Sequence, residues 1–209
     1  MAISLKAQNA VPLATLIIMQ VYIVLALMSG TYDLDGLYLK VETVSAILVV
    51  NAVLLWISYW LPADIKNGLV FCRYKNALPG HRFISLIESD PRIDVHQVYA
   101  QYDLSSLTND ENAQNSYWYR VFYKPNSSSI EILSAHKSYL LYRDACAVSM
   151  ILFIAYCPLA WILSLYIDHT AIQYGLVFII FAFGFCIAAQ NAGKRMVTTA
   201  VAMSVAGSL

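Results

Sequence analysis

The stretch "VPLATLIIMQVYIVLALMS", Val11–Ser29, contains no Asp, Glu, Lys or Arg. An α-helix needs about 20 mostly apolar residues to cross the hydrocarbon core of a bilayer. Three further stretches are equally free of charge: Val44–Leu61, Cys146–Tyr166 and Ile172–Ala189. The sequence therefore predicts four transmembrane helices.

The composition supports a membrane protein and argues against a nucleic-acid-binding protein. The chain of 209 residues is 59% hydrophobic and 12% charged, whereas a soluble domain has about a quarter charged residues. Its formal net charge is zero, so it lacks the basic field that attracts nucleic acid. The four cysteines form no CxxC pair and are interpreted as reduced structural residues.

The polar segment between the second and third apolar runs carries signals for helices. Asp90 and Asn109 or Asp110 are predicted to start two of them, and a third helix is predicted to run unbroken from Ile130 to Tyr166. The predicted fold class is therefore all-α: a polytopic membrane protein with four transmembrane helices and a small helical cytoplasmic domain between the second and third spans.

The distribution of basic residues predicts the orientation. Of the 13 Lys and Arg residues, 12 lie in the N-terminus, in Pro62–Asp144 or in the C-terminal tail. The positive-inside rule then places both termini and the middle segment in the cytoplasm. The predicted organisation is a first transmembrane hairpin (1–61), a cytoplasmic helical domain (62–143), a second transmembrane hairpin (144–190) and a cytoplasmic tail (191–209). The apolar tail can lie in the membrane interface, or pack against the cytoplasmic domain or a neighbouring subunit.

The stretch "RYKNALPGHR", Arg73–Arg82, raises the question of a binding site. Its basic residues can serve only as a topology signal, or the backbone amides of the Pro-Gly turn can also face an anion. The same alternatives hold for other basic and aromatic residues of the middle segment, whose charges can instead pair with neighbouring acids. The candidate ligand- or partner-binding residues are Arg73, Lys75, His81, Arg82, Arg92, Trp118, Arg120 and Lys137.

The spans themselves contain a few uncharged polar residues, among them Gln20, Asn51 and Ser164. Such residues can form hydrogen bonds between helices, or line a pore between subunits. The spans have no charged residue, which argues against an ion-coupled carrier. No nucleotide-binding or hydrolase motif occurs and the four histidines are scattered, so no enzyme activity, metal site or cofactor is predicted.

Four short strings, "RYKNALPGHR", "DPRID", "QNSYWYR" and "AHKSYLLYRD", resemble a pattern of bacterial inner-membrane proteins. The layout of two spans, a cytoplasmic domain and two more spans is similar to that of small membrane components of anti-phage systems, such as the membrane subunit of the Kiwa system. The resemblance implies a bacterial inner (cell) membrane location, a defence role and a homo-oligomer, taken as a tetramer.

The leading hypothesis is an oligomeric effector that opens a pore or disrupts the membrane when its cytoplasmic domain receives a signal. That signal is a nucleotide second messenger or a cytoplasmic protein partner. The alternative is a non-conducting membrane sensor or scaffold that docks a soluble effector through its cytoplasmic domain. Membrane lipid is a partner in both cases, and direct binding of nucleic acid is not expected.

Overall fold

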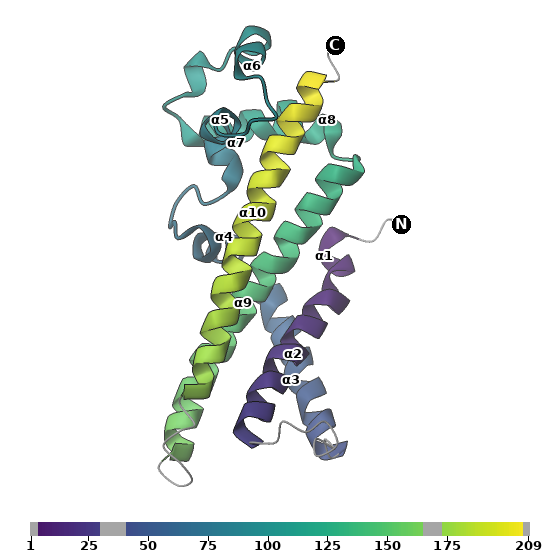
Figure 1. Ribbon diagram of the computed structural model, residues 1–209, viewed down its shortest axis with the longest axis vertical. Coiled ribbons are helices and arrows are strands. Elements are labelled where there is room, and N and C mark those ends of the chain that lie inside the picture. Colours follow the sequence, from purple (N-terminus) through teal and green to yellow (C-terminus); the bar gives the residue numbers. More distant parts are fainter. Residues whose placement is uncertain (1–3, 30–40, 165–172, 207–209) are drawn as a thin grey trace. The chain divides into compact units, whose positions relative to one another are not determined.

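The computed structural model describes residues 4–29, 41–164 and 173–206, and within these ranges every regular element is a helix. The chain forms two compact units (Figure 1). Unit 1 comprises Met1–Lys66 and Leu141–Ile187, and unit 2 comprises Asn67–Leu140 and Ala188–Leu209. The prediction of an all-helical chain is confirmed.

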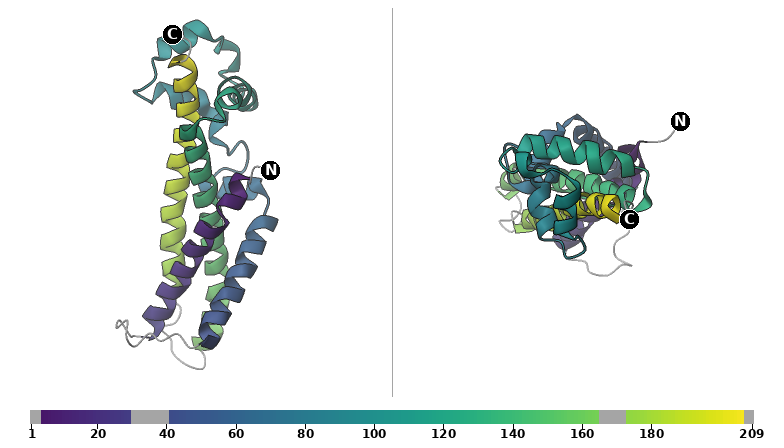
Figure 2. Two further views of the ribbon diagram at one scale, coloured as in Figure 1. Left: turned by 90° about the vertical axis from the view of Figure 1, so that its right-hand side faces the viewer. Right: turned by 90° about the horizontal axis from the view of Figure 1, so that it is seen from above.

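Unit 1 is built from the apolar segments. It contains α1 (Leu5–Gln8), α2 (Ala10–Ser29), α3 (Val41–Trp60), the later part of α9 (Ile130–Ser164) and the earlier part of α10 (Leu176–Ala206). Figure 2 shows the long helices of this unit side by side. They share a core whose buried members are Leu13, Ile17, Val24, Leu54, Ala145, Val148, Leu152 and Phe178.

Several helices have the length and apolar character of membrane spans. Among the described residues, Ala10–Met28, Ile130–Ile162 and Gln173–Ala206 satisfy both conditions. Ile47–Trp60 and α4 (Ala63–Phe71) are bent by 95° at a short break, and they provide a fourth span if they are counted together. The structure thus has three candidate spans, or four with the bent pair.

Unit 2 is made of short elements around the ends of the two longest helices. In chain order they are the end of α4, η1 (Pro79–Arg82), α5 (Phe83–Glu88), α6 (Val95–Gln101), η2 (Ser105–Leu107), α7 (Glu111–Trp118), the π-helix η3 (Tyr119–Tyr123) and α8 (Lys124–Asn126). The first part of α9 and the last part of α10 complete the unit. Its core includes Phe83, Ile87, Val98, Trp118, Phe122, Ile132, Val197 and Val201.

The C-terminal tail belongs to this core. α10 runs without interruption to Ala206, and its residues Met196, Val197, Ala200, Val201 and Val205 are buried against the short helices of unit 2. Of the alternatives considered for the tail, packing against the helical domain is the one that the structure shows. The burial explains the apolar sequence of a segment that is too short to span a bilayer.

The helix boundaries confirm some local predictions and correct others. Asp110, one of the two predicted alternatives, is the N-cap of α7 and accepts hydrogen bonds from the amides of Asn112 and Ala113. The prediction that Asp90 starts the next helix is wrong, because α6 begins at Val95 with Asp94 as its cap. α9 is one continuous helix from Ile130 to Ser164, which confirms the predicted long helix over the described residues.

A substitution at Gly80 tests how closely the Pro-Gly turn of unit 2 is packed. A Cβ atom there would lie 2.4 Å from Asn115 Oδ1 and 2.8 Å from Trp118 Cε3. We expect Gly80→Ala to lower the free energy of unfolding by about 1–3 kcal/mol, the typical cost of overpacking. The measurement is thermal unfolding of the purified chain in detergent. Gly184→Ala is the matched control, because a Cβ there has no other atom within 4 Å; an equal loss in both variants would contradict the interpretation.

Candidate functional site

Three charged side chains are buried together in unit 1. Lys66 Nζ lies 3.1 Å from Asp144 Oδ1, and the same oxygen accepts from Arg143 Nε at 3.0 Å and from Arg143 Nη2 at 2.8 Å. The side chains of Lys66 and Asp144 are 1% and 5% exposed, and that of Arg143 is 8% exposed. One carboxylate therefore holds two cations inside an apolar unit.

The bend between α3 and α4 brings Lys66 to this place. After the bend, Lys66 Nζ donates a hydrogen bond to the carbonyl oxygen of Ser58 and lies 3.3 Å from the Ser58 hydroxyl. Ser58 is in the last turn of α3, where helix carbonyls have no partner within their own helix. Lys66 thus binds a free carbonyl oxygen at the end of α3 and the carboxylate of Asp144 at the same time.

This ion cluster was not recognised from the sequence. Lys66 and Arg143 both lie in the segment Pro62–Asp144, whose basic residues predict the orientation and can pair with neighbouring acids. One local feature points to burial: the pair Arg143–Asp144 is followed directly by an apolar run. A buried charge needs a partner, but no local pattern says that Lys66 supplies it.

In unit 2, two hydrogen bonds involve residues that lie close in the sequence to Lys66 or that contact α4. The Tyr139 hydroxyl donates to Asn67 Oδ1 at 2.7 Å, and Gln190 Nε2 donates to the carbonyl oxygen of Val70 at 2.7 Å. These bonds attach α4 to α9 and α10 within the unit. The first one joins residues close to the points where the chain enters and leaves the segment Asn67–Leu140.

The stretch from Arg73 to Arg82 is largely engaged in contacts within unit 2. Arg73 Nη1 pairs with Glu111 Oε1 at 3.0 Å, and this guanidinium lowers the pKa of the Glu111 carboxyl. The Arg82 guanidinium carbon lies 5.9 Å from the centre of the Phe71 ring, and burial lowers the pKa of Arg82. His81 Nδ1 lies 3.2 Å from the carbonyl oxygen of Leu78, while Lys75 is exposed.

The Pro-Gly turn in that stretch is covered by protein. Pro79 and Gly80 are both buried. Arg82 Nε is also buried, and it has no hydrogen-bond partner in the described part of the chain. Arg73 and Arg82 are near enough for their charges to affect each other, so the structure brings these two candidates together beside Glu111.

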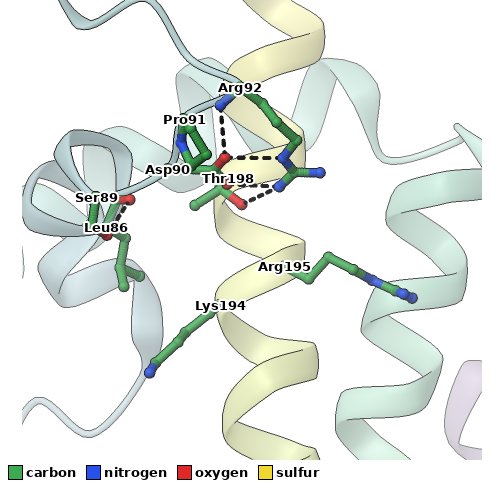
Figure 3. A pocket seen from close by; sticks show the side chains of 8 residues that line it. All are labelled: Leu86, Ser89, Asp90, Pro91, Arg92, Lys194, Arg195 and Thr198. Carbon is green, nitrogen blue, oxygen red and sulfur yellow. Dashed lines mark hydrogen bonds and ion pairs between the residues drawn. The ribbon is translucent and has the colours of Figure 1, made fainter.

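Arg92 lies at a different place in unit 2. Its Nε and Nη2 donate to the two carboxylate oxygens of Asp90 at 2.9 and 2.7 Å, and Nη2 also donates to Thr198 Oγ1 at 2.9 Å (Figure 3). These hydrogen bonds hold the pKa of Asp90 well below its ordinary value. Asp90 therefore binds Arg92 instead of capping a helix, which is the physical reason for the corrected boundary of α6.

Asp90 and Arg92 also line an open pocket of about 390 Å³. α10 contributes Lys194, Arg195 and Thr198 to its wall, and the turn after α5 contributes Ser89, Asp90 and Arg92. Figure 3 shows Lys194 and Arg195 extending from α10 in different directions. Arg92 is a candidate predicted from the sequence, whereas its proximity to the two basic residues Lys194 and Arg195 is seen only in the structure.

The remaining candidates of unit 2 are dispersed. Trp118 is 5% exposed and its indole Nε1 donates to the carbonyl oxygen of Val197 at 3.3 Å, so its ring is part of the core. Arg120 is exposed on the π-helix η3, where its Nε donates to the carbonyl oxygen of Ser116 at 3.4 Å. Lys137 is partly exposed on α9. These three do not join the pocket around Arg92.

The polar residues of the spans are engaged within one chain. Ser149 Oγ donates to Gln20 Oε1 at 2.7 Å, and Asn51 Nδ2 donates to the carbonyl oxygen of Ala14 at 3.1 Å. Gln20 is fully buried and Asn51 is 4% exposed. Both contacts join different helices of unit 1. Ser164 is the last residue of α9, and its side chain lies outside the described part of the structure.

Comparison of the chain with known protein families, with curated proteins and with solved structures finds no match. Among the described residues, no group of three or more His, Cys, Asp and Glu side chains has the arrangement of a metal site. The features of the described structure that bear on function are therefore the two charged sites and the distribution of polar groups in unit 1.

The ion cluster makes a prediction about stability. We expect Asp144→Asn to lower the free energy of unfolding by about 3–5 kcal/mol, because the buried cations Lys66 and Arg143 lose their carboxylate. Lys66→Met should cost less, since the Arg143–Asp144 pair remains. Thermal unfolding in detergent measures both effects. Asp64→Asn, at an exposed carboxylate of the same helix α4, is the control. A loss in Asp64→Asn as large as in Asp144→Asn would refute the assigned role.

Proposed function

We propose that this chain is a four-span membrane protein that acts as a non-conducting sensor or scaffold, with unit 2 as the part that receives a soluble partner. The observation that carries the proposal is the inward placement of polar side chains in unit 1. In lipid, polar groups have no water to bind and must find partners within the protein. Gln20, Ser149 and the amide nitrogen of Asn51 do so inside a single chain, whereas the buried Oδ1 of Asn51 has no hydrogen-bond partner among the described residues.

The outward-facing side chains of unit 1 support this reading. On α3, α9 and α10 the large exposed residues of the apolar segments are aliphatic or aromatic, as expected for contact with lipid tails. They include Leu48, Val49, Val53, Trp56, Ile154, Trp161, Ile180 and Phe183. On the described part of α2, Thr15 is exposed, but its hydroxyl donates to the carbonyl oxygen of Val11 at 3.1 Å. A row of free polar groups for a pore wall is absent from these described surfaces.

The proposed topology joins the helix lengths to the charge distribution. α3 supplies the second span, and the bend between α3 and α4 lies near the cytoplasmic surface. The concentration of Lys and Arg in 1–10, 62–144 and 190–209 supports a cytoplasmic location for both termini and for residues 67–140. The bacterial inner membrane and the anti-phage setting come from the sequence resemblance and belong to the proposal.

Cys72 gives a direct test of the topology, because it is a free and exposed thiol in unit 2. We expect a membrane-impermeant maleimide to label Cys72 only after the inner membrane has been opened, since the reagent cannot reach the cytoplasm of intact cells. Cys72→Ser controls for the three other cysteines. In that background, His169→Cys lies in the predicted outer connection and should react without opening. Labelling of Cys72 in cells with an intact inner membrane would reverse the proposed orientation.

A leakage assay distinguishes a scaffold from a pore. The purified chain is reconstituted into liposomes that contain K⁺ and a small fluorescent dye. Because Gln20, Asn51 and Ser149 each form a hydrogen bond within one chain, we expect release no faster than from protein-free vesicles. A pore-forming peptide provides the positive control. Protein-dependent release of K⁺ or dye would favour the competing hypothesis of a membrane-permeabilising effector.

A further inference from the structure

The pocket around Arg92 has an excess of positive charge. The side chains of Arg92, Lys194 and Arg195 line it together with a single carboxylate, that of Asp90. Asp90 is already engaged by Arg92 through two hydrogen bonds from the guanidinium. The charges of Lys194 and Arg195 are therefore not balanced by the walls of the pocket.

The two basic residues of α10 also have no partner elsewhere in the described structure. Both are exposed, and neither forms an ion pair or a hydrogen bond with its side chain there. α10 contains no Asp or Glu between Leu176 and Ala206, so pairing with an acid one turn away on the same helix is impossible. Two adjacent cations without an acid are a local source of positive potential.

Arg92 is a third hydrogen-bond donor of the pocket, and unlike Lys194 and Arg195 it is held by bonds within the protein. Asp90 and Thr198 occupy its Nε and Nη2, and its Nη1 has no hydrogen-bond partner among the described residues. The bonds to Asp90 and Thr198 hold the guanidinium plane in place, so Nη1 can bind a ligand with little loss of conformational freedom. Lys194 and Arg195 extend from α10 in different directions (Figure 3), and binding of one ligand together with Arg92 requires their long side chains to rotate.

We propose that this pocket binds a phosphate group through Arg92, Lys194 and Arg195. Arginine and lysine together are the usual protein donors to phosphate oxygens, and a pocket of about 390 Å³ is within the range of small-ligand sites. The phosphate belongs either to an anionic lipid headgroup or to a soluble phosphate compound. The inference deepens the proposed function, on which it rests for the receptor role of unit 2.

The position of Lys194 along α10 makes both sources chemically accessible. Residues 173–193 carry no charge, and as a helix they extend over roughly 30 Å, the thickness of the hydrocarbon core. In the proposed topology Lys194 and Arg195 are then at the level of the cytoplasmic headgroups. A headgroup phosphate and a phosphate from the cytosol can both approach them there.

Binding to the full-length chain in detergent tests the proposal. Isothermal titration calorimetry is carried out with pyrophosphate in one series. A second series uses a short-chain phosphatidylglycerol, with short-chain phosphatidylcholine as the zwitterionic reference. Binding of pyrophosphate identifies a soluble phosphate ligand, and binding of phosphatidylglycerol without pyrophosphate identifies a lipid. Binding of neither probe, or equal binding of both lipids without pyrophosphate, overturns the proposal.

Variants locate the binding at the pocket. We expect Lys194→Gln and Arg195→Gln each to weaken the affinity for the bound probe roughly fivefold, as for the loss of one cation near an anionic surface. Lys124→Gln is the matched control, because Lys124 is an exposed cation on α8 outside the pocket. Thermal unfolding confirms that the variants remain folded. Equal weakening by Lys124→Gln would overturn the assignment. Leakage and Cys72 labelling are read independently, so failure of the pocket is distinguishable from failure of the proposed function.

Discussion

The ion pair between Lys66 and Asp144 is the contact on which the organisation of the chain depends. Its two residues are 78 positions apart in the sequence, one just before the segment Asn67–Leu140 and the other just after it. A segment inserted into a helical bundle can fold as a unit only if its two ends are held close together. In unit 1 the buried pair does this, and in unit 2 the bond from Tyr139 to Asn67 has the same effect.

The same physical rule applies to this pair and to the other buried polar groups of unit 1. A charge in an apolar surrounding is stable only with a partner of opposite charge and with further hydrogen bonds. Asp144 receives both Lys66 and Arg143, and Lys66 reaches the end of α3 as well. Gln20, Asn51 and Ser149 are likewise buried inside the unit. The large exposed side chains of its apolar segments are mostly apolar, which is the arrangement that favours a lipid-embedded scaffold over a pore wall.

α10 connects the apolar segments with the proposed ligand site through its sequence. Up to Ile187 it belongs to unit 1, and from Ala188 onwards it packs into the core of unit 2. Trp118 donates to the carbonyl oxygen of Val197 and Asn126 donates to the hydroxyl of Ser204, so this part of the helix is held by polar bonds as well as by packing. Lys194 and Arg195 are presented on the exposed face of the same turns. A single helix therefore supplies buried residues to the core of unit 2 and two hydrogen-bond donors, Lys194 and Arg195, to the pocket.

The sequence by itself determined the all-helical class, the apolar segments and the long α9, and it narrowed the cap of α7 to Asn109 or Asp110, because each of these depends on residues within a few turns of one another. Tertiary structure alone decided the long-range partners of the charged residues. Arg92, which binds Asp90, also donates to Thr198, and the bend after α3 turns Lys66 of the basic Pro62–Asp144 segment towards Asp144. Trp118 and the apolar tail are likewise core residues because they pack against each other, and the Trp118 indole donates to the carbonyl oxygen of Val197. Contacts between residues about 80 to 100 positions apart leave no periodic pattern in a single sequence, so only the folded chain reveals them.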